Sequence, residues 1–457
     1  MAEIIPTGVQ VAGDIVVDEL VLIGANGKQF DLHDFLIELN ITEDIFSPTM
    51  YGNIVLTDSI NIIEKLPVCG EEYLRVKVST PGMDIPIYKT FRVYSISDRY
   101  MIQDDKTQGY ILHFCSNETF LESLNKVYKT FSGNITDVVP QIYSDYVMSA
   151  RNIIVDGSDN LVDSNDYVAL NVTDTTSNSV KFTSPGWGPL KCLSWLAAKS
   201  LSNQFKSSDF LFYESNKQFY FGSISSIIDA YKSAKYVAGA FYYKPSNIRT
   251  LGNNVAVEGV QYTPPNLNRE YSIANEFTIV DQFNTLKNTN DGYYASQMIS
   301  VNLTTKKFEY HNYDYGVNFA DYVHTDTYTM FSQNQFRNPQ SSVIMNVQQS
   351  RLYDNGQHNV NEYAPHVTQN RISLLRGFSN LSIELVVPGR TDFECGAVVY
   401  FSHPKLGPKD ASDAGKDSED KYLSGLYLVT AVRHKITLKK HMMIISASKD
   451  SLSKPYQ

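Results

Sequence analysis

The sequence predicts a mainly β (α+β) protein in which two similar antiparallel β-barrel tube domains enclose an inserted small α+β domain. Three observations support this fold class. Tyr and Phe are abundant, with 31 and 23 residues, and aromatic rings pack well on the pleated surface of strands. Alternating apolar and polar residues recur in many short segments, which is typical of half-buried strands. Four such segments near the start of the chain recur in the same order near its end.

The repeated segments lie at nearly one separation along the chain. Residues 52–59 (GNIVLTDS) correspond to 380–387 (NLSIELVV), with Ile54 aligned on Ile383, and residues 69–76 (CGEEYLRV) correspond to 395–402 (CGAVVYFS). Residues 91–102 (FRVYSISDRYMI) correspond to 427–438 (YLVTAVRHKITL), with Val93 on Val429, and residues 110–121 (YILHFCSNETFL) to 441–452 (HMMIISASKDSL). Self-similarity in series outranks local pattern when a fold is predicted. We therefore predict an internal duplication; the alternative is two unrelated antiparallel modules that look alike.

The first barrel is predicted over residues 1–121. In residues 32–42 (LHDFLIELNIT), Leu39 and Ile41 alternate with Glu38 and Asn40, so one face of this strand is buried and the other meets water or a partner. Five or six antiparallel strands and one small helix at 60–67 describe a closed or nearly closed barrel, because closure removes exposed strand edges.

Residues 122–246 are predicted to form a small helical or α+β domain. Thr119 and Glu122 have the spacing of a capping box, which predicts that a helix starts there. Residues 186–202 (GWGPLKCLSWLAAKSLS) predict an amphipathic helix, and residues 209–223 (DFLFYESNKQFYFGS) predict a hairpin that turns at 215–217. Residues 149–184 are rich in Ser, Asp, Asn and Thr and predict a long surface segment.

The second barrel is predicted over residues 247–315 plus 366–457, with residues 316–365 as an inserted arm. Residues 294–315 (YASQMISVNLTTKKFEYHNYDY) predict a hairpin that turns at 304–306. Residues 366–378 (HVTQNRISLLRGF) predict a helix. Residues 407–421 (GPKDASDAGKDSEDK) form a charged stretch without an apolar anchor, which we expect to be solvated or ordered by a partner.

Charge and composition exclude several classes of protein. The net charge is -10 and no basic run occurs, which argues against an electrostatic grip on nucleic-acid phosphates. No apolar run approaches the roughly 20 residues of a membrane helix, and the start MAEIIPTGVQVAG lacks the features of a signal peptide. We expect no membrane anchor and folding in a cytoplasm. The cysteines Cys69, Cys115, Cys192 and Cys395 lie far apart and are interpreted as free thiols.

Several His, Asp and Ser residues are candidates for chemical sites, and each also has a structural interpretation. A metal site could be made from His311, Asp314, Asp321, His324 and Asp326, and a calcium site from Asp410, Asp413, Asp417 and Asp420, but neither set has a known ligand spacing. Ser97 and Ser446 lack the motif of a nucleophilic serine, and His434 and His441 are interpreted as loop or interface histidines. The sequence contains no nucleotide-binding glycine motif. We assign no catalytic, cofactor-binding or metal-ligating residue and predict that the protein is not an enzyme.

Several segments carry a resemblance to a known family. They are residues 424–436 (SGLYLVTAVRHKI), 441–451 (HMMIISASKDS), 369–401 (QNRISLLRGFSNLSIELVVPGRTDFECGAVVYF), 210–221 (FLFYESNKQFYF) and 291–315 (DGYYASQMISVNLTTKKFEYHNYDY). These segments resemble the baseplate hub protein of contractile-tailed bacteriophages, a family distantly similar to the hub part of type VI secretion spike proteins. The likeness covers most of the chain outside 149–184 and 316–364, and it is strongest from His366 onward.

The resemblance implies a structural protein of the virion tail baseplate, assembled in the host cytoplasm. It implies a homotrimer whose subunits each supply two tube domains, so that a ring of six joins a threefold central spike protein to a sixfold tail tube protein. Wedge proteins of the baseplate are further implied partners, and DNA would pass through the lumen without specific binding. The acidic composition suits such a channel, because clustered Lys and Arg would hold the phosphates.

One alternative function is a virion adhesion or glycan-binding module, suggested by the aromatic segment TYTMFSQNQF near Tyr328. Aromatic residues are also typical anchors of protein interfaces, which favours the hub. Some hub assemblies of the family carry a wall-degrading domain, and we expect no room for one after the second barrel.

Overall fold

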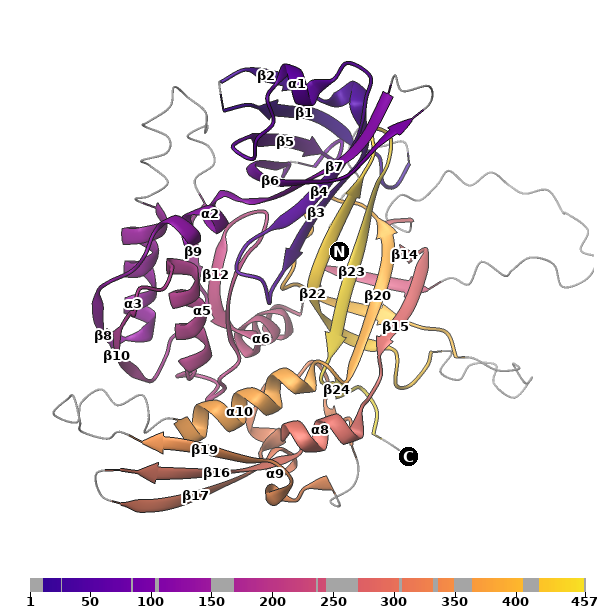
Figure 1. Cartoon of the computed structure of the whole chain (residues 1–457). Helices are drawn as coiled ribbons and strands as arrows, with labels where there is room; N and C mark the ends of the chain where they lie inside the picture. Colours follow the sequence, from indigo (N-terminus) through magenta and orange to yellow (C-terminus); the bar gives the residue numbers. More distant parts are fainter. Residues whose placement is uncertain are drawn as a thin grey trace, which may run out of the picture.

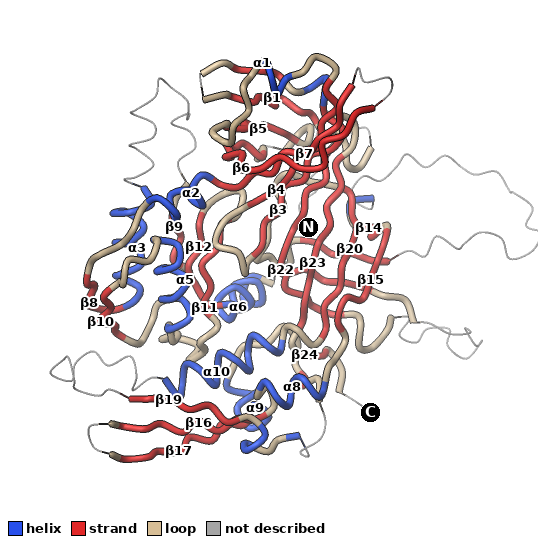
Figure 2. The backbone as a smooth tube through the Cα atoms, viewed as in Figure 1, coloured by secondary structure: helices blue, strands red, loops and turns tan. Residues whose placement is uncertain are grey.

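The computed structural model describes residues 11–25, 27–83, 85–102, 107–148, 168–235, 237–243, 270–303, 306–331, 336–348, 364–405 and 419–455. The protein is mainly β, as predicted (Figures 1 and 2). One large curled sheet occupies most of the molecule, while helices gather beside it and below it in the view of Figure 2. Among the described residues, no helix is long and apolar enough to cross a membrane.

The large sheet contains fourteen strands from both ends of the chain. They are β1 (Val16–Ile23), β2 (Gln29–Asp31), β3 (Leu36–Asp44), β4 (Tyr51–Asp58), β5 (Tyr73–Ser79), β6 (Ile87–Ile102), β7 (Thr107–Ser116), β13 (Gly239–Tyr243), β14 (Ile273–Ala274), β15 (Glu276–Asp281), β20 (Leu381–Pro388), β21 (Val398–Ser402), β22 (Gly425–Ile436) and β23 (His441–Lys449). In strands such as β4, buried residues such as Ile54 and Leu56 alternate with more exposed ones such as Val55, because successive side chains point to opposite faces.

The four predicted repeat segments pair in the same order in both halves of this sheet. The N-terminal order is β4-β7-β6-β5 and the C-terminal order is β20-β23-β22-β21, with every pair antiparallel. Strand β6 has a bulge between Val93 and Ser95, and β22 has one between Val429 and Ala431. A bulge is a specific local feature, so its recurrence supports the alignment of Val93 with Val429.

Strand pairing shifts the other predicted alignments slightly. Val93 lies opposite Phe114, and Val429 lies opposite Ala447, so Phe114 corresponds to Ala447. Leu112 then corresponds to Ile445, and its neighbour Ile54 corresponds to Leu385 instead of Ile383.

The shift along β7 and β4 is two residues, which keeps every side chain on its predicted face. In β5 the shift is one residue, because Leu74 lies opposite Phe91 and Val399 lies opposite Tyr427. Leu74 therefore corresponds to Val399, and the predicted match of Cys69 with Cys395 is off by one.

The two halves of the sheet join edge to edge. Strand β3 pairs antiparallel with the far part of β22, from Ala431 opposite Asp44 to Ile436 opposite Leu39. Because of this seam the strands of the two halves form one continuous curled sheet (Figure 1). Two separate barrels therefore stay a prediction.

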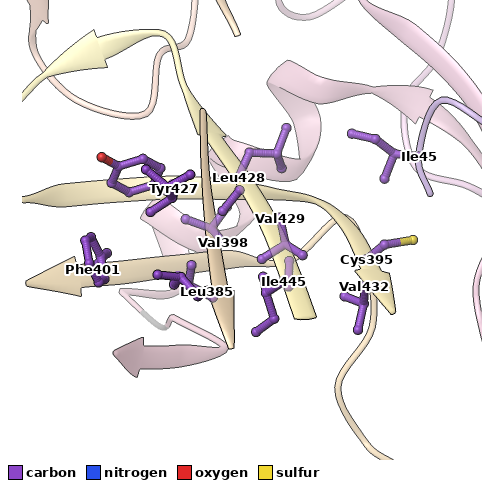
Figure 3. Close-up of a cluster of buried hydrophobic side chains, with 14 of the residues drawn as sticks. Ile45, Leu385, Cys395, Val398, Phe401, Tyr427, Leu428, Val429, Val432 and Ile445 are labelled. Atoms are coloured by element: carbon purple, nitrogen blue, oxygen red, sulfur yellow. The ribbon is translucent and has the colours of Figure 1, made fainter. Parts of the chain in front are cut away.

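Two hydrophobic cores interlock across the seam. Ile45, which follows β3, packs in the core of the C-terminal half with Val398, Val432 and Ile445 (Figure 3). Conversely, Ile436 of the C-terminal half packs in the core of the N-terminal half. Both side chains are fully buried, and burying an isoleucine stabilises the fold by about 1.5–3 kcal/mol.

The middle region packs its own core between short helices and two small sheets. The sheets contain β8 (Thr130–Asn134) with β10 (Ser179–Thr183), and β9 (Leu170–Val172) with β11 (Phe210–Glu214) and β12 (Phe219–Ser223). The helices are α2 (Asn117–Leu124), α3 (Ile135–Ile142), the π-helical turn η2 (Tyr143–Met148), α5 (Pro189–Lys199) and α6 (Ile224–Ala234). The predicted helix and hairpin are confirmed as α5 and the antiparallel pair β11–β12.

The predicted capping box at Thr119 is wrong. Helix α2 begins at Asn117, after Ser116, so Thr119 lies inside it. The carboxylate of Glu122 instead accepts hydrogen bonds from the backbone N–H groups of Leu190 (2.7 Å) and Lys191 at the start of α5. A carboxylate satisfies unpaired N–H groups at any helix N-terminus within reach, and here the helix is distant in sequence.

A further group of elements lies below the large sheet in Figure 1. A three-stranded sheet of β16 (Ala295–Asn302), β17 (Lys307–Asp314) and β19 (Val343–Gln348) packs against α10 (Ala364–Gly377). The predicted hairpin is confirmed as β16–β17, but it pairs with β19 of the arm, outside the fourteen-stranded sheet. Shorter elements are α1 (Ile62–Lys65), α8 (Thr285–Asp291), α9 (Tyr315–Asn318), η1 (His33–Phe35), η3 (Phe319–Asp321), η5 (Pro339–Ser341), β18 (Tyr328–Thr329) and β24 (Ser451–Leu452).

Candidate functional site

The structure does not bring the five residues considered for a metal site, His311, Asp314, Asp321, His324 and Asp326, together into one ligand set. Asp314 accepts hydrogen bonds from Arg337 Nε at 2.8 and 2.9 Å and caps α9 through the N–H of Val317. His311 lies 3.7 Å from Glu309 on β17. Among the described residues, no group of three or more His, Cys, Asp or Glu side chains could hold a metal ion.

His324 and Asp326 belong to a buried polar cluster at the end of β23. His324 Nδ1 lies 2.6 Å from Asp450 Oδ2, and Asp450 also accepts from the backbone and hydroxyl of Thr325. Burial raises the pKa of Asp326 to about 6, although nearby Lys449 opposes the shift. Burial lowers the pKa of Lys449 to about 8. These contacts tie the 324–326 segment to the large sheet.

The acidic stretch and the two candidate serines also do not form a recognisable chemical site among the described residues. Of the acidic stretch 407–421, Asp410, Asp413 and Asp417 lie outside the described residues, and Asp420 accepts from the N–H groups of Tyr422 and Leu423. Ser97 Oγ lies 2.8 Å from His113 Nε2, but a catalytic histidine needs a third group to orient it. Among the described residues, no carboxylate is hydrogen-bonded to His113. Ser446 accepts at its backbone carbonyl from the Thr430 hydroxyl.

The aromatic segment near Tyr328 is turned inward in part. The ring of Phe331 meets those of Tyr293 and Tyr294 edge-on, with centroids 5.9 and 5.2 Å apart, and Phe336 stacks on Tyr294 at 5.4 Å. These rings line a hollow of about 430 Å³. These rings pack against one another, and glycan binding by this segment stays a prediction.

The outward face of the large sheet forms a polar hollow over the seam. Its volume is about 590 Å³, and its walls come from both halves of the sheet: Glu38, Asn40, Thr42, Asp44, Tyr51, Gly52, Asn53, Tyr94, His113, Glu384, Ala431, Arg433, Ile444 and Ser446. The Asn40 amide crosses two strands, donating to Glu38 Oε1 at 2.8 Å and to Asn53 Oδ1 at 3.0 Å. A polar face of a sheet must lie against water or against another polar surface.

The charge of this hollow is mildly acidic. Its walls carry the carboxylates of Glu38, Asp44 and Glu384 and the guanidinium of Arg433. Burial raises the pKa of Glu38, but hydrogen bonds from Lys435 and Asn40 outweigh it and hold the pKa below its usual value. Lys435 Nζ lies 2.8 Å from Glu38. Among the described residues that line the hollow, carboxylates thus outnumber the one guanidinium, and no cluster of cations that would hold phosphates occurs.

The inward side of the seam holds a buried chain of three titratable groups. Glu43, His434 and His441 are fully buried. His434 Nδ1 lies 3.0 Å from His441 Nε2, and His434 Nε2 lies 3.8 Å from Glu43 Oε1. The carboxylate of Glu43 favours a proton on His434 Nε2, the ring nitrogen that faces it. His434 Nδ1 is then unprotonated and accepts a hydrogen bond from His441 Nε2. Burial and the neighbouring His434 hold the pKa of His441 well below its usual value.

These histidines lie on the paired strands β22 and β23, so the interpretation as loop histidines is wrong. His434 lies opposite Ile41 of β3 at the seam. A place at an interface with another protein stays a prediction. Sequence reasoning missed Glu43, although a signal was present. Glu43 continues the buried alternation of Leu39 and Ile41, and a charge on the apolar side of a strand indicates a buried partner.

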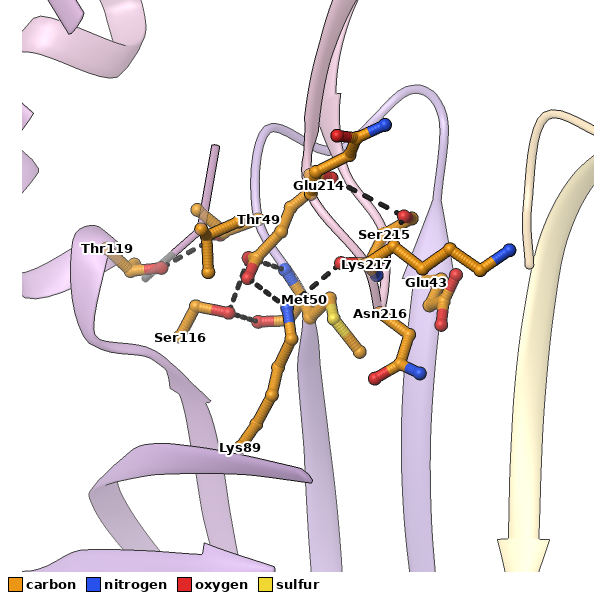
Figure 4. A network of polar contacts seen from close by, with 12 residues as sticks. Glu43, Thr49, Met50, Lys89, Ser116, Thr119, Glu214, Ser215, Asn216 and Lys217 are labelled. Carbon is orange, nitrogen blue, oxygen red and sulfur yellow. Dashed lines mark hydrogen bonds and ion pairs between the residues drawn. The ribbon is translucent and has the colours of Figure 1, made fainter. Parts of the chain in front are cut away.

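Another buried ion pair joins the N-terminal half to the middle region (Figure 4). Lys89 Nζ lies 2.6 Å from Glu214 Oε1, and the two side chains are 8% and 2% exposed. Glu214 Oε2 also accepts from the N–H of Met50 at 2.9 Å and from Ser116 Oγ at 2.5 Å. One carboxylate on β11 therefore holds three separate segments of the N-terminal half. Sequence spacing gave no signal for these contacts.

The same hairpin reaches the C-terminal half. After Glu214, Ser215 Oγ donates to Glu394 at 2.9 Å, and Lys217 Nζ lies 2.9 Å from the same carboxylate. The middle region thus contacts both halves of the sheet and holds their relative position.

Comparisons with solved structures show which proteins share this architecture. A tail protein from Neisseria meningitidis MC58 matches with a TM-score of 0.51 and 10% sequence identity, over 96% of this chain and 96% of that chain. The 43 kDa tail protein of prophage MuSo2 from Shewanella oneidensis matches with a TM-score of 0.50 and 11% identity, over 95% of this chain and 99% of that chain. No family model and no curated protein matches the sequence.

The chain therefore has the fold of phage tail proteins over nearly its whole length. The structural likeness to such proteins that the sequence predicts is confirmed. At 10% and 11% identity, these matches are evidence of a shared fold alone.

Proposed function

We propose that the protein is a structural subunit of a phage tail baseplate, a central hub that forms a trimeric ring. The observation that carries this proposal is the repeated strand order of the large sheet, with the two four-strand units joined edge to edge at the β3–β22 seam. A chain that holds two similar units side by side can present six of them as a trimer. A threefold spike could then sit on one side of the ring and a sixfold tube on the other.

The proposed organisation follows from this arrangement. Residues 1–121 and residues 247–315 plus 366–457 are proposed as two similar tube-like barrel domains, completed in the ring. Residues 122–246 are the intervening domain that supports them, and its last strand, β13, joins the second unit by pairing with β21. Residues 316–365 are an arm that occurs in the second unit alone, which makes the periphery of the ring threefold. The β16–β17 hairpin lies outside the fourteen-stranded sheet and pairs with β19 of this arm.

The polar hollow over the seam is proposed to face the lumen of the ring. Its mildly acidic walls suit a channel for DNA, because phosphates would pass without being held. The proposed partners are the central spike, the tail tube and wedge proteins. We propose no catalytic activity, and the place of action is the virion tail after assembly in the host cytoplasm.

The mass in solution tests the proposal. The chain weighs 51.6 kDa, so light scattering behind a sizing column should give about three times that mass, and negative-stain images should show threefold rings. A stable monomer or dimer over the micromolar range would contradict the hub. A glycan array serves as the control, since specific binding there would favour adhesion.

A further inference from the structure

Along its outer edge, strand β22 pairs with two different strands, one before its bulge and one after it. Before the bulge, Gly425 to Leu428 pair with β21. After the bulge, residues 431–436 pair with β3 of the other half. The outer edge of β22 is therefore covered along its length, and Val432 is 0% exposed.

Strand β6 is the counterpart of β22 and has the same bulge. Before it, Ile87 to Arg92 pair with β5. After it, β6 pairs with β7, and no described strand pairs with its outer edge. Ile96 corresponds to Val432, yet Ile96 is 40% exposed. The position that is covered in one half is open in the other.

Strand β15 is the counterpart of β3 and is open in the same way. Ile41 of β3 lies opposite Gly52, and Ile279 of β15 lies opposite Ile383, the residue that corresponds to Gly52. Strand β15 pairs with β20, and no described strand covers its other edge. Ile279 is 38% exposed, whereas Ile41 is 0% exposed.

We infer that the outer edge of β6 in one copy of the chain pairs antiparallel with β15 of the next copy, repeating between chains the β3–β22 seam. This inference rests on the proposed ring and identifies the surfaces that close it. The partner is a second copy because the two open edges are the counterparts of two edges that already pair within the chain. A pair of unlike edges on one chain gives a heterologous contact, which closes into a ring when the rotation allows.

The chemistry of both edges fits a covered surface. Lysine and proline, which commonly protect the open edges of soluble proteins, are absent from β15 (EFTIVD) and from residues 95–102 of β6 (SISDRYMI). Each strand has one register irregularity, between Ile279 and Asp281 in β15 and between Ser97 and Tyr100 in this part of β6. Val280, Tyr100 and Met101 are exposed on these strands. Main-chain hydrogen bonds between two such edges supply binding, and the apolar side chains beside them add to it.

The internal seam also fixes the register. Arg433 lies opposite Thr42 within the chain. Arg433 corresponds to Ser97, two residues after the shared bulge in each strand. Thr42 corresponds to Asp281, because each is opposite an equivalent residue, Tyr51 in one half and Ser382 in the other. Ser97 of one copy should therefore lie opposite Asp281 of the next.

Disulfide trapping tests this register directly. The variant S97C/D281C is made in a C69S background, since Cys69 is exposed and the other three cysteines are buried. Residues directly opposite across two antiparallel strands have Cα atoms about 4.5–5.5 Å apart, which suits a disulfide. Mild oxidation should convert more than about half of the chain into linked dimers and trimers on non-reducing gels.

The matched control moves one cysteine along the same strand. In S97C/T278C the second cysteine lies three residues from Asp281, roughly 10 Å away, so it should remain largely unlinked. Thr278 and Asp281 are exposed and Ser97 is half-buried, so both variants should fold like the parent by circular dichroism.

The outcomes separate this inference from the proposed hub. Trimeric mass with linking in S97C/D281C and little in S97C/T278C supports it. Trimeric mass without linking, or with equal linking in both variants, overturns this pairing while the ring stands. Monomeric parent protein overturns both.

Discussion

Replacing Lys89 with methionine should test the buried clamp between the N-terminal half and the middle region. The carboxylate of Glu214 would keep its hydrogen bonds from Met50 and Ser116 but lose the ammonium group 2.6 Å away. Removing one partner of a buried ion pair typically costs about 3–5 kcal/mol, because the remaining charge is left without compensation. We expect K89M to lower the free energy of unfolding by about that amount.

Equilibrium unfolding in urea measures this effect, with fluorescence of Trp187 and Trp195 in the middle region and circular dichroism for the sheets. A matched control is K129M, which breaks an ion pair of 3.0 Å whose two side chains are each 42% exposed. Such exposed pairs contribute about 0–1 kcal/mol.

The double variant K89M/E214Q removes both charges and should recover much of the loss, which identifies the effect as pairwise. A cost below about 1 kcal/mol for K89M, equal to that of K129M, would refute the account of Glu214 as a desolvated clamp.

Three further predictions concern the sheet, its seam and a helix start. Ile383→Asp, at a fully buried position, should abolish folding by placing an ion in a core, whereas Ile37→Asp at an exposed position should give soluble protein; soluble I383D with normal circular dichroism would contradict the burial. The folded-state pKa of His441 is depressed, so the unfolded state binds more protons below its usual pKa of about 6.5, and stability should fall as the pH drops from 7.5 to 5. His441→Gln should flatten that dependence in urea midpoints measured across the range, and an unchanged slope would exclude this histidine as its source. Glu122→Ala should destabilise the protein by about 0.5–2 kcal/mol by freeing the N–H groups of Leu190 and Lys191, while an effect within error would show that water replaces the carboxylate.

Local pattern predicted the elements that alternate strongly. The alternation of apolar and polar residues is a local property of the sequence, and it predicts strands β4, β6 and β22 and the hairpin β11–β12. The series of four segments also predicted the common strand order of the two halves. The exact alignment of the strands beside β6 failed by one or two residues, because the register of each strand is set by the strand it pairs with, and this pairing leaves little trace in composition.

Contacts between distant segments were beyond sequence reasoning. Glu122 has the spacing of a local cap but serves α5, and Glu214 looks like the end of an exposed strand but is buried by three other segments. Both carboxylates are placed by tertiary packing, which overrides local preference. The continuous sheet was missed for the same reason, since β3 and β22 are far apart in the chain.

The seam between β3 and β22 also has a mechanical consequence. Its two strands belong to one polypeptide and are braced by Ile45 and Ile436, each inserted in the core of the opposite half. In the proposed ring, three joints of six would thus be internal and permanent, and the other three would depend on association alone. Under load, such a ring would separate into whole chains at alternate joints, and never into six equal pieces.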